Sequence, residues 1–590
     1  MSVALLLALP AVLAAPVSAA PPAPLPYEDA RTAEVVTAQG LVPEPAPEGK
    51  HIAFIRVVRH DVFTEDELIP TFFNVFHGLT DEDVVTRELL FKTGDAYKGD
   101  TAEETRRLLR SMGTFALVRI VPVQVPGAPD DVGVLVFTRD LWSLRLEQSF
   151  QFTGTHVDEV TLQLTELNLG GRAKRLTARF NLLPFEYSAG QVYLDRRLLG
   201  GDLLLMETGD LILNRETSKL EGGQAYLRLD RPLWDLSDRW GFSSNLLFDQ
   251  RVGRQTAGNQ ILTWDNPRTP IPEHILRQWD QRFIGISAAG TIQQGKDVIN
   301  RFTGGFGVKD FTVTSDKGFR PRDDREVYPF VAYGAFEPRW RTWHDLATYG
   351  VAEDVRLGPS LQLRLATPLE SLGSDRTAFN LWAGATETEA WGGDGLADAA
   401  AAAESTVERG GRLNELLYLR LRGATPSADW GRLVARWDAY LRRDLDGSKS
   451  LSLVSLGGDN GLRGYPSQAF VGFGDNLMRG SAEWRTPPLE WSSVHLGGVM
   501  FYDAGSVYSG LATAELHQSV GLGARVLLPQ FNRYVYRLDV GFPLDGTGFM
   551  VNLSGGSNQA TPMTADEDEL FESSVAGVAA QPDGPRQILQ

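Results

Sequence analysis

Three residues have types and a spacing that could do chemistry. One is an arginine that lies between two glycines, and the other two are acidic residues further along the chain. Arg463 lies in the segment GGDNGLRGYPSQ, after Gly461 and before Gly464. Glu483 follows in GSAEWRTP and Asp503 in FYDAGSVY. The two glycines allow a sharp fold that presents Arg463 at the tip of a loop. A guanidinium is a planar fork of donors, so two carboxylates around it can accept paired charge-assisted hydrogen bonds.

The elements that must position these residues have a period of two. In the segment 432–442, Leu433, Trp437 and Leu441 fall on one face, and Arg436 falls on the other. The same division recurs through residues 142–556. A soluble β-sandwich also alternates, but its strands are commonly shorter than the segments of about 10 to 14 residues found here. A transmembrane strand needs this length, with its apolar face toward lipid.

This pattern predicts a mainly β chain with a C-terminal transmembrane antiparallel β-barrel over residues 142–556. The sheet must close on itself, because unpaired backbone amides are not tolerated in hydrocarbon. Strand-like segments number about 16 to 19, and we predict about 16 strands. The alanine-rich segment 397–405 and the proline-marked segment ILTWDNPRTPIPEH are interpreted as loops.

The N-terminal region predicts export followed by a small folded unit. Residues 1–20 contain an apolar run and then small residues, which is typical of a signal peptide, although a helix kept in the mature chain is the alternative. Residues 21–50 are rich in Pro and Ala and predict an extended linker. Residues 51–141 predict a β-α-α-β-β unit, in which residues 62–79 are a partner surface or a plain insertion.

Composition argues against several functions. The formal charge of −18 disfavours nucleic-acid binding, and the absence of cysteine excludes thiolate metal sites, cysteine nucleophiles and disulfides. The eight histidines are scattered without ligand spacing, and we interpret them as surface or barrel-face residues. We find no G-x-S-x-G, H-E-x-x-H or phosphate-loop motif. The sequence therefore predicts no metal, no cofactor and no enzymatic activity.

Two sets of motifs resemble known proteins over about residues 51–556. LLFKTGDAY and RRLLRSMGTF look like a polypeptide-transport-associated (POTRA) domain. ELNLGGRAKRLTARF, GLRGY and FYDAGSVY resemble the BamA/TamA superfamily of outer-membrane proteins, also called bacterial surface antigen proteins. The chain departs from the pattern because it has room for one POTRA-like domain only. Residues 557–590 also continue past the last strand, with a run of acids that predicts a disordered tail.

The resemblance implies that the loop carrying Gly461, Arg463, Gly464 and Tyr465 drops into the barrel. Its arginine would then meet Glu483 and Asp503 on the inner wall. Strand parity supports this pairing, although Asp503 shares its face with Phe501. Two alternatives stay open. The residues are an ordinary hairpin arginine and unrelated acids, or the cluster braces the barrel without handling substrate.

The resemblance also implies a noncovalent activity, the insertion or passage of client polypeptides. The seam between the first strand, Leu144 to Phe152, and the last strand, which includes Phe549 and Gly555, would admit a client strand by edge pairing. Glycine weakens a strand, although Gly555 and its neighbour could simply end it. The implied location is the bacterial outer membrane, with the N-terminal domain and the tail in the periplasm.

The implied partners are the lipid bilayer, client polypeptides and a periplasmic accessory protein bound through the POTRA-like domain. Two other functions stay open, a dedicated two-partner-type secretion pore and a passive pore. A passive pore gives no reason for a POTRA-like domain.

Overall fold

The structure is a computed structural model that describes most of the chain between residues 26 and 563. The described residues are 26–63, 71–153, 156–257, 260–266, 269–314, 319–446, 453–458, 461–473, 475–491, 494–531, 533, 535–546, 548–555, 559–561 and 563. The predicted signal peptide, residues 1–20, lies outside them. Among the described residues, no helix combines the length and the apolar character that crossing a membrane requires.

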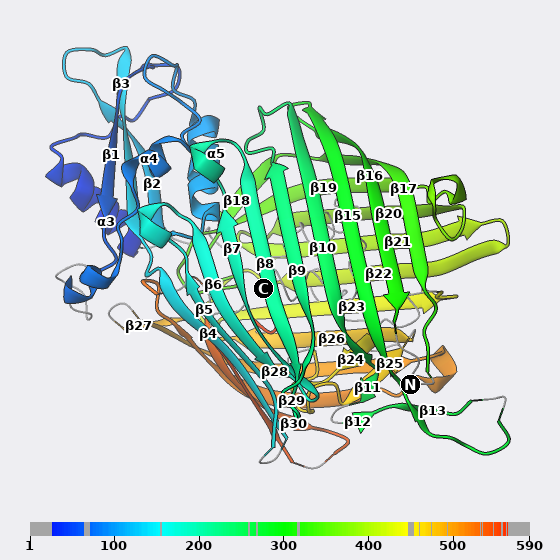
Figure 1. The fold of residues 1–590 in the computed structure, drawn as a ribbon. Helices are drawn as coiled ribbons and strands as arrows, with labels where there is room; N and C mark the ends of the chain where they lie inside the picture. The colour runs from blue at the N-terminus through cyan, green and yellow to red at the C-terminus, as the bar shows by residue number, and fades with distance from the viewer. Residues whose placement is uncertain are drawn as a thin grey trace.

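The N-terminal unit is a three-stranded sheet with helices packed beside it, drawn in blue in Figure 1. The sheet order is β1-β3-β2, with β1 parallel and β2 antiparallel to β3. Ile52, Leu109, Phe115 and Val136 are buried in its core. The β-α-α-β-β order predicted for residues 51–141 is present. In chain order the elements are α3(Pro26–Ala38), β1(His51–His60), η1(Thr71–Phe76), α4(Glu82–Thr86), α5(Gly99–Ser111), β2(Phe115–Gln124) and β3(Asp131–Asp140).

Helix α3 lies within the predicted linker, residues 21–50, and corrects the prediction that this segment is extended. The helix starts at Pro26, whose fixed φ suits the first helical turn, and it has acidic residues in that turn. Val35 and Val36 are buried in a cluster that includes Leu135 of β3. The proline-rich composition around the helix concealed a segment that packs on the sheet.

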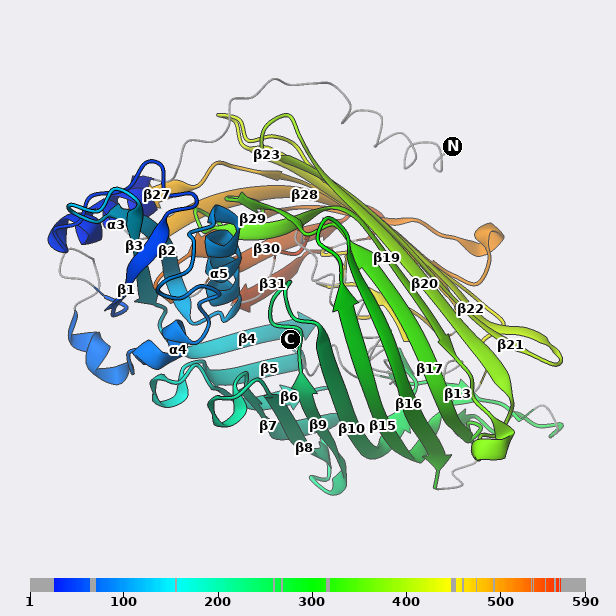
Figure 2. The ribbon, with the colours of Figure 1, turned by 90° about the horizontal axis from the view of Figure 1, so that it is seen from above.

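The strands that follow form one closed antiparallel barrel (Figures 1 and 2). They are β4(Leu144–Thr153), β5(His156–Glu166), β6(Arg175–Leu182), β7(Glu186–Asp195), β8(Leu204–Asn214), β9(Leu220–Arg231), β10(Trp240–Arg254), β15(Gln278–Gln294), β16(Ile299–Val313), β17(Asp324–Phe336), β18(Arg339–Trp343), β19(Glu353–Ala366), β20(Ala378–Trp391), β21(Gly395–Glu408), β22(Gly411–Ala424), β23(Arg432–Arg443), β26(Asn476–Arg485), β27(Leu489–Trp491), β28(Val494–Tyr508), β29(His517–Leu527), β30(Tyr536–Pro543) and β31(Met550–Gly555). The ring closes where β31 pairs with β4.

The barrel wall has one apolar face and one polar face, as the alternation predicts. On β23, Leu433 is 47% and Leu441 is 37% exposed, whereas Arg432 is 4% and Asp438 is 1% exposed. Exposed leucines at alternate positions are typical of a surface that lies against lipid, and buried charges belong to the inner side of the wall. The predicted mainly β fold with a large antiparallel barrel is confirmed.

The barrel contains more strands than the 16 that we predicted. β18 and β17 both pair with β19, and β27 and β26 both pair with β28, so each of these two pairs is one interrupted strand. The described residues therefore form about 20 strands around the wall. The prediction of 16, the low end of the roughly 16 to 19 strand-like segments counted in the sequence, is wrong.

Strand β21 shows one source of the error. The alanine-rich segment 397–405 forms most of this strand, and β21 pairs along its length with β20 and β22. Asp398, Ala400 and Ala402 are buried, whereas the intervening alanines are exposed. Alanine is depleted in strands, so pairing with the neighbours decides the structure here.

The remaining elements are short and lie between barrel strands. The proline-marked segment predicted as a loop, residues 261–274, includes β13(Thr263–Trp264) and the last residue of β12(Gln260–Ile261), which pair with short strands just outside it. The partners are β11(Thr256–Ala257) for β12 and β14(Ile275–Leu276) for β13. The 3-10 helices here are η2(Leu169–Gly171), η3(Leu198–Gly200), η4(Glu370–Leu372) and η6(Leu511–Thr513).

The N-terminal unit is docked on the end of the barrel where β4 begins, which we call the domain end (Figure 2). Arg110 of α5 donates Nε and Nη2 to the carboxylate of Asp354, at 2.9 and 2.6 Å. Phe63 packs against Trp142 and Phe531, with ring centroids 5.7 and 5.5 Å away. A paired guanidinium and an aromatic cluster hold the two parts together.

Candidate functional site

The loop between β23 and β26 folds against the inner side of the barrel wall. Its strands β24(Leu453–Leu456) and β25(Phe470–Phe473) pair with each other. Gly461 adopts φ +87°, a conformation that favours glycine, as the sequence suggested. Gly464 is required for a different reason. A Cβ there would lie 2.5 Å from Ser519 Cβ and 2.9 Å from Pro543 N, so the glycine allows the loop to touch β29 and β30.

The structure brings Arg463 together with both predicted acids. Its Nε and Nη2 donate to Asp503 Oδ2 and Oδ1, each at 2.8 Å, and its Nη1 donates to Glu483 Oε1 at 2.8 Å. Nη2 also reaches Ser481 Oγ at 3.1 Å. The Arg463 side chain is 1% exposed, and both carboxylates are fully buried. The fork therefore satisfies one acid from β26 and one from β28.

Phe501 completes the surroundings of the guanidinium. The Arg463 Cζ lies 3.6 Å from the centroid of the Phe501 ring, which is a cation–π contact. Phe501 precedes Asp503 by two positions, so both side chains face the lumen. The shared face of Phe501 and Asp503, which looked inconsistent in the sequence, is thus part of the site. We call Arg463, Glu483, Asp503, Ser481 and Phe501 the arginine hub.

A second ring of charges surrounds the arginine hub. Arg485 donates Nε and Nη2 to Glu483 Oε2, at 2.9 and 2.7 Å. Arg525 donates Nη1 to Asp539 Oδ1 at 2.7 Å, and Asp539 Oδ2 lies 3.8 Å from Arg463 Nη1. Sequence reasoning missed Arg525 and Asp539. Their alternation with apolar residues in GLGARVLLP and YRLDVGFPL was the signal that could have found them.

The loop also reaches the last strand of the barrel. Asn552 of β31 donates Nδ2 to the backbone carbonyl of Arg463 at 3.2 Å. Tyr465 donates its hydroxyl to the Gln518 carbonyl of β29 at 3.2 Å and stacks edge-on against Phe470. The residues of the predicted loop motif therefore connect β26, β28, β29 and β31, the strands that lead to the closure point.

The predicted seam closes through a short ladder. Within the described residues, β31 pairs with β4 at Leu553–Phe150, Ser554–Ser149 and Gly555–Gln148. On its other side β4 pairs with β5 from Leu144–Glu166 to Thr153–His156. Of the four predicted seam residues, Gly555 alone pairs across the closure in the described ladder. Leu144 and Phe152 pair with β5 instead, and Phe549 precedes β31 and is 62% exposed.

A buried histidine joins the N-terminal unit to the barrel and corrects the interpretation of every histidine as a surface or barrel-face residue. His77 Nε2 lies 2.9 Å from Asp140 Oδ2, and its Nδ1 lies 3.2 Å from Ser143 Oγ. The hydrogen-bonded series Ser143, His77 and Asp140 resembles a hydrolytic triad. The His77 and Asp140 side chains are fully buried, however, and Ser143 is 3% exposed. Asp140 also accepts from the Thr80 amide at 2.7 Å. This burial favours a structural clamp, since a nucleophile must reach its substrate.

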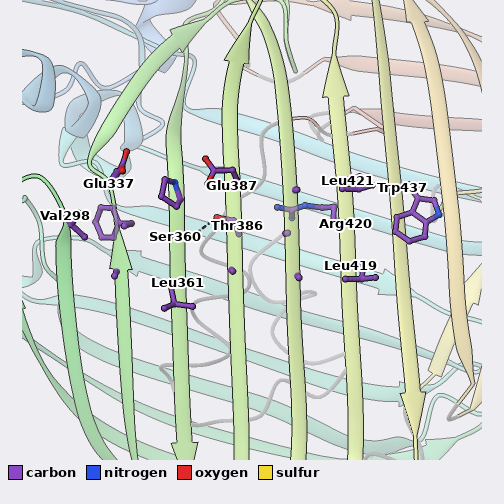
Figure 3. Close-up of a pocket in the computed structure, with 17 residues that line it drawn as sticks. Val298, Glu337, Ser360, Leu361, Thr386, Glu387, Leu419, Arg420, Leu421 and Trp437 are labelled. Carbon is purple, nitrogen blue, oxygen red and sulfur yellow. Dashed lines mark hydrogen bonds between the residues drawn. The ribbon is translucent and has the colours of Figure 1, made fainter. Parts of the chain in front are cut away.

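The outer wall carries a depression that reaches β23, the strand that pairs with β26 of the arginine hub. A cavity of about 700 Å³ lies along β17 and β19–β23 (Figure 3). Its floor includes Ala385 and Ala401, between the larger Leu361, Leu421 and Trp437. Exposed leucines place it on the lipid-facing side.

Among the described residues, no group of three or more acidic or histidine side chains could hold a metal ion.

A comparison with protein families finds a match to the part of the chain that contains the arginine hub. Residues 448–548 match the Omp85 superfamily domain, which confirms the resemblance predicted from the motifs in this segment. No curated protein matches the chain.

Three solved structures align over much of the chain, but with low identity and low TM-scores. BamA from Haemophilus ducreyi lacking POTRA domains 1–3 is 11% identical over 88% of this chain and 89% of that chain, with a TM-score of 0.34. CdiB from Acinetobacter baumannii is 12% identical over 86% and 74%, with a TM-score of 0.38. CdiB from Escherichia coli is 11% identical over 86% and 76%, with a TM-score of 0.37.

Proposed function

We propose, from the premise that residues 448–548 carry an Omp85 superfamily domain, that this chain inserts or passes client polypeptides at the bacterial outer membrane. The observation that carries the proposal is the arginine hub, which ties a loop inside a closed barrel to the strands beside the seam. The apolar outer face suits a lipid bilayer. The work is noncovalent, and neither a metal nor a cofactor is part of the proposed mechanism.

In this mechanism, the seam between β31 and β4 opens to admit a client strand. An edge strand presents unpaired N–H and C=O groups, so a client segment can add to it by backbone pairing. The short ladder between β31 and β4 supports the choice of this edge. The arginine hub would hold β31 in place through Asn552, so that the rest of the wall keeps its shape while the edge exchanges partners.

The N-terminal unit would act as a POTRA-like domain in the periplasm. Its docking on the domain end, through Arg110 and Asp354, suits a unit that delivers a client to the seam. Phe72 is 63% and Val75 is 77% exposed on η1, within the lengthened connection 62–79. Exposed apolar side chains of this kind favour contact with a periplasmic accessory protein.

Depletion of the protein followed by proteomics of the outer membrane and of the secreted fraction tests the proposed function. Loss of many barrel proteins would indicate assembly, and loss of one secreted protein would indicate the alternative, a dedicated two-partner-type pore. If neither fraction changed, both functions would be contradicted and a passive pore would remain.

A disulfide across the seam tests the mechanism. The chain has no cysteine, so Ser149→Cys with Ser554→Cys can form one bond only. We expect loss of activity when the pair is oxidised and recovery under reductant. A matched pair, Thr161→Cys with Asn181→Cys between β5 and β6, should leave activity unchanged. Full activity of the oxidised seam variant would exclude lateral opening.

A further inference from the structure

Residues 559–561 and 563, which follow β31 in the chain, lie in the barrel lumen, and for these described residues the prediction of a disordered tail over residues 557–590 is corrected. Gln559 is 3%, Thr561 is 1% and Met563 is 0% exposed. Their side chains are buried at alternate positions, whereas Ala560 is half-buried. Alternate burial is typical of an extended segment that lays one face on a wall.

The polar contacts of this segment are made with the arginine hub and its surroundings. Thr561 Oγ1 lies 3.0 Å from Glu483 Oε1 and 2.8 Å from Ser481 Oγ. Arg485 Nη2 donates to the Thr561 carbonyl at 2.7 Å, and Arg525 Nε donates to Gln559 Oε1 at 2.7 Å. One oxygen of Glu483 thus serves both Arg463 and Thr561, so the arginine hub and the tail share an acceptor.

An apolar socket receives the end of the same segment. Met563 packs in a buried cluster with six other side chains from the domain end of the barrel. They are Trp343, Leu346, Leu357, Leu396, Ala424 and Val434. Arg485 ties this socket to the polar contacts, since its Nη1 donates to the Leu346 carbonyl at 2.7 Å. A thioether fills an irregular apolar space well.

We propose that this part of the lumen is a binding site for an extended peptide, and that residues 559–561 and 563 occupy it until another extended segment displaces them. The site takes a hydroxyl-bearing or small polar residue over Glu483 and an unbranched apolar residue two positions later in the socket. It holds its occupant through side chains and one backbone carbonyl, so different sequences with this alternation can fit. The identity of the natural competitor, a client polypeptide, rests on the proposed function.

The covalent link to β31 explains how weak contacts can keep the tail residues in the site. A segment joined to β31 by a few residues has a high effective concentration at the site, so a free peptide competes with it poorly. Displacement would then require a competitor that is itself held nearby, as a segment added at the seam would be. Thr561 and Arg463 both donate to Glu483. An exchange of occupants would therefore change the hydrogen bonds of the loop that ties β31 to the wall.

A labelled peptide with the sequence of residues 557–567 tests the inference on the purified full chain in detergent. The variant Met563→Glu places a charge in the socket and should expel the tail. We expect the peptide to bind this variant about tenfold or more tightly than the unchanged chain, by fluorescence anisotropy. Ala560→Glu is the matched control, because Ala560 is half-buried, and it should behave like the unchanged chain. A second expelled variant, with residues 559–563 replaced by Gly and Ser, should repeat the result with an unmodified socket.

Equal binding to all variants, or no binding to either expelled variant while both retain heat-modifiable barrels, would overturn the inference. A peptide in which the residues corresponding to Thr561 and Met563 are changed to alanine and glutamate should not bind. The assay involves no client. Binding together with unchanged outer-membrane and secreted proteomes on depletion would therefore uphold the peptide site and refute the proposed function.

Discussion

Replacing Arg463 by alanine is expected to lower the heat resistance and the activity of the barrel together. The structure indicates which carboxylate would be left without an arginine partner. Glu483 keeps Arg485 and Asp539 keeps Arg525 when Arg463 is removed. Asp503, which is fully buried, keeps the Ser481 hydroxyl at 2.7 Å but no arginine among the described residues. Leaving one buried charge without its partner costs about 3–5 kcal/mol.

A second substitution separates two effects on stability. One is the cost of leaving Asp503 charged without a partner, and the other is the loss of the contacts that Arg463 makes. In the double variant Arg463→Ala with Asp503→Asn, the uncompensated charge is gone, and we expect recovery of about 1–3 kcal/mol. Arg463→Lys keeps the charge but loses the fork, so it should fall between the unchanged chain and the alanine variant.

The assay is the temperature at which the folded band is lost in gel electrophoresis, measured beside activity. Arg179→Ala is the matched control, because Arg179 is a buried arginine paired with Asp210 in another part of the wall. It should lower heat resistance with a smaller loss of activity. An Arg463→Ala barrel with normal heat resistance but no activity would refute the bracing role.

Three further predictions follow from the same contacts. Gly464→Ala should lower heat resistance, because its Cβ would meet Ser519 Cβ at 2.5 Å, whereas Gly510→Ala, with nothing within 4 Å, should be neutral. Arg110→Ala should speed hydrogen exchange in α5 by loosening the docked N-terminal unit, and Arg106→Ala, on the same helix, is the control; equal exchange in both would contradict the role of Asp354. Burial raises the pKa of Glu104, which accepts the Leu236 amide at 2.8 Å, so its contribution to stability is greatest below the ordinary glutamate pKa and is lost as pH rises through the raised value. Glu104→Gln should therefore stabilise docking more at about pH 8 than at about pH 4, and a pH-independent effect in thermal unfolding would contradict the assignment.

The pairing of Arg463 with Glu483 and Asp503 was expected from the family resemblance, and local signals in the sequence supported it. A positive-φ glycine, an arginine at a loop tip and acids at fixed strand parity can each be recognised within a few residues. Asp539 has the same parity signal and was missed for want of a motif. Helix α3 carries a start signal in Pro26 and its acidic first turn, which the surrounding prolines obscured.

Other features could not be read from local pattern. Alanine does not distinguish a strand from a loop, so the pairing of β21 depends on β20 and β22. The contacts of Thr561 and Met563 join residues about 80 to 220 positions apart, and a polar tail gives no periodic signal for them. The burial of His77 depends in the same way on Asp140, which is distant in sequence.

The reaction rate of a single cysteine at Leu462 tests the central claim most directly. Leu462 is 0% exposed beside Arg463, in a buried cluster with Leu456 and Leu477, and the chain has no other thiol. In the intact barrel we predict that Leu462→Cys resists a membrane-impermeant maleimide, and that adding Arg463→Ala makes it react. Labelling of Leu462→Cys in a heat-resistant barrel at the rate of a free thiol would contradict the claim that the arginine hub holds this loop against the inner wall.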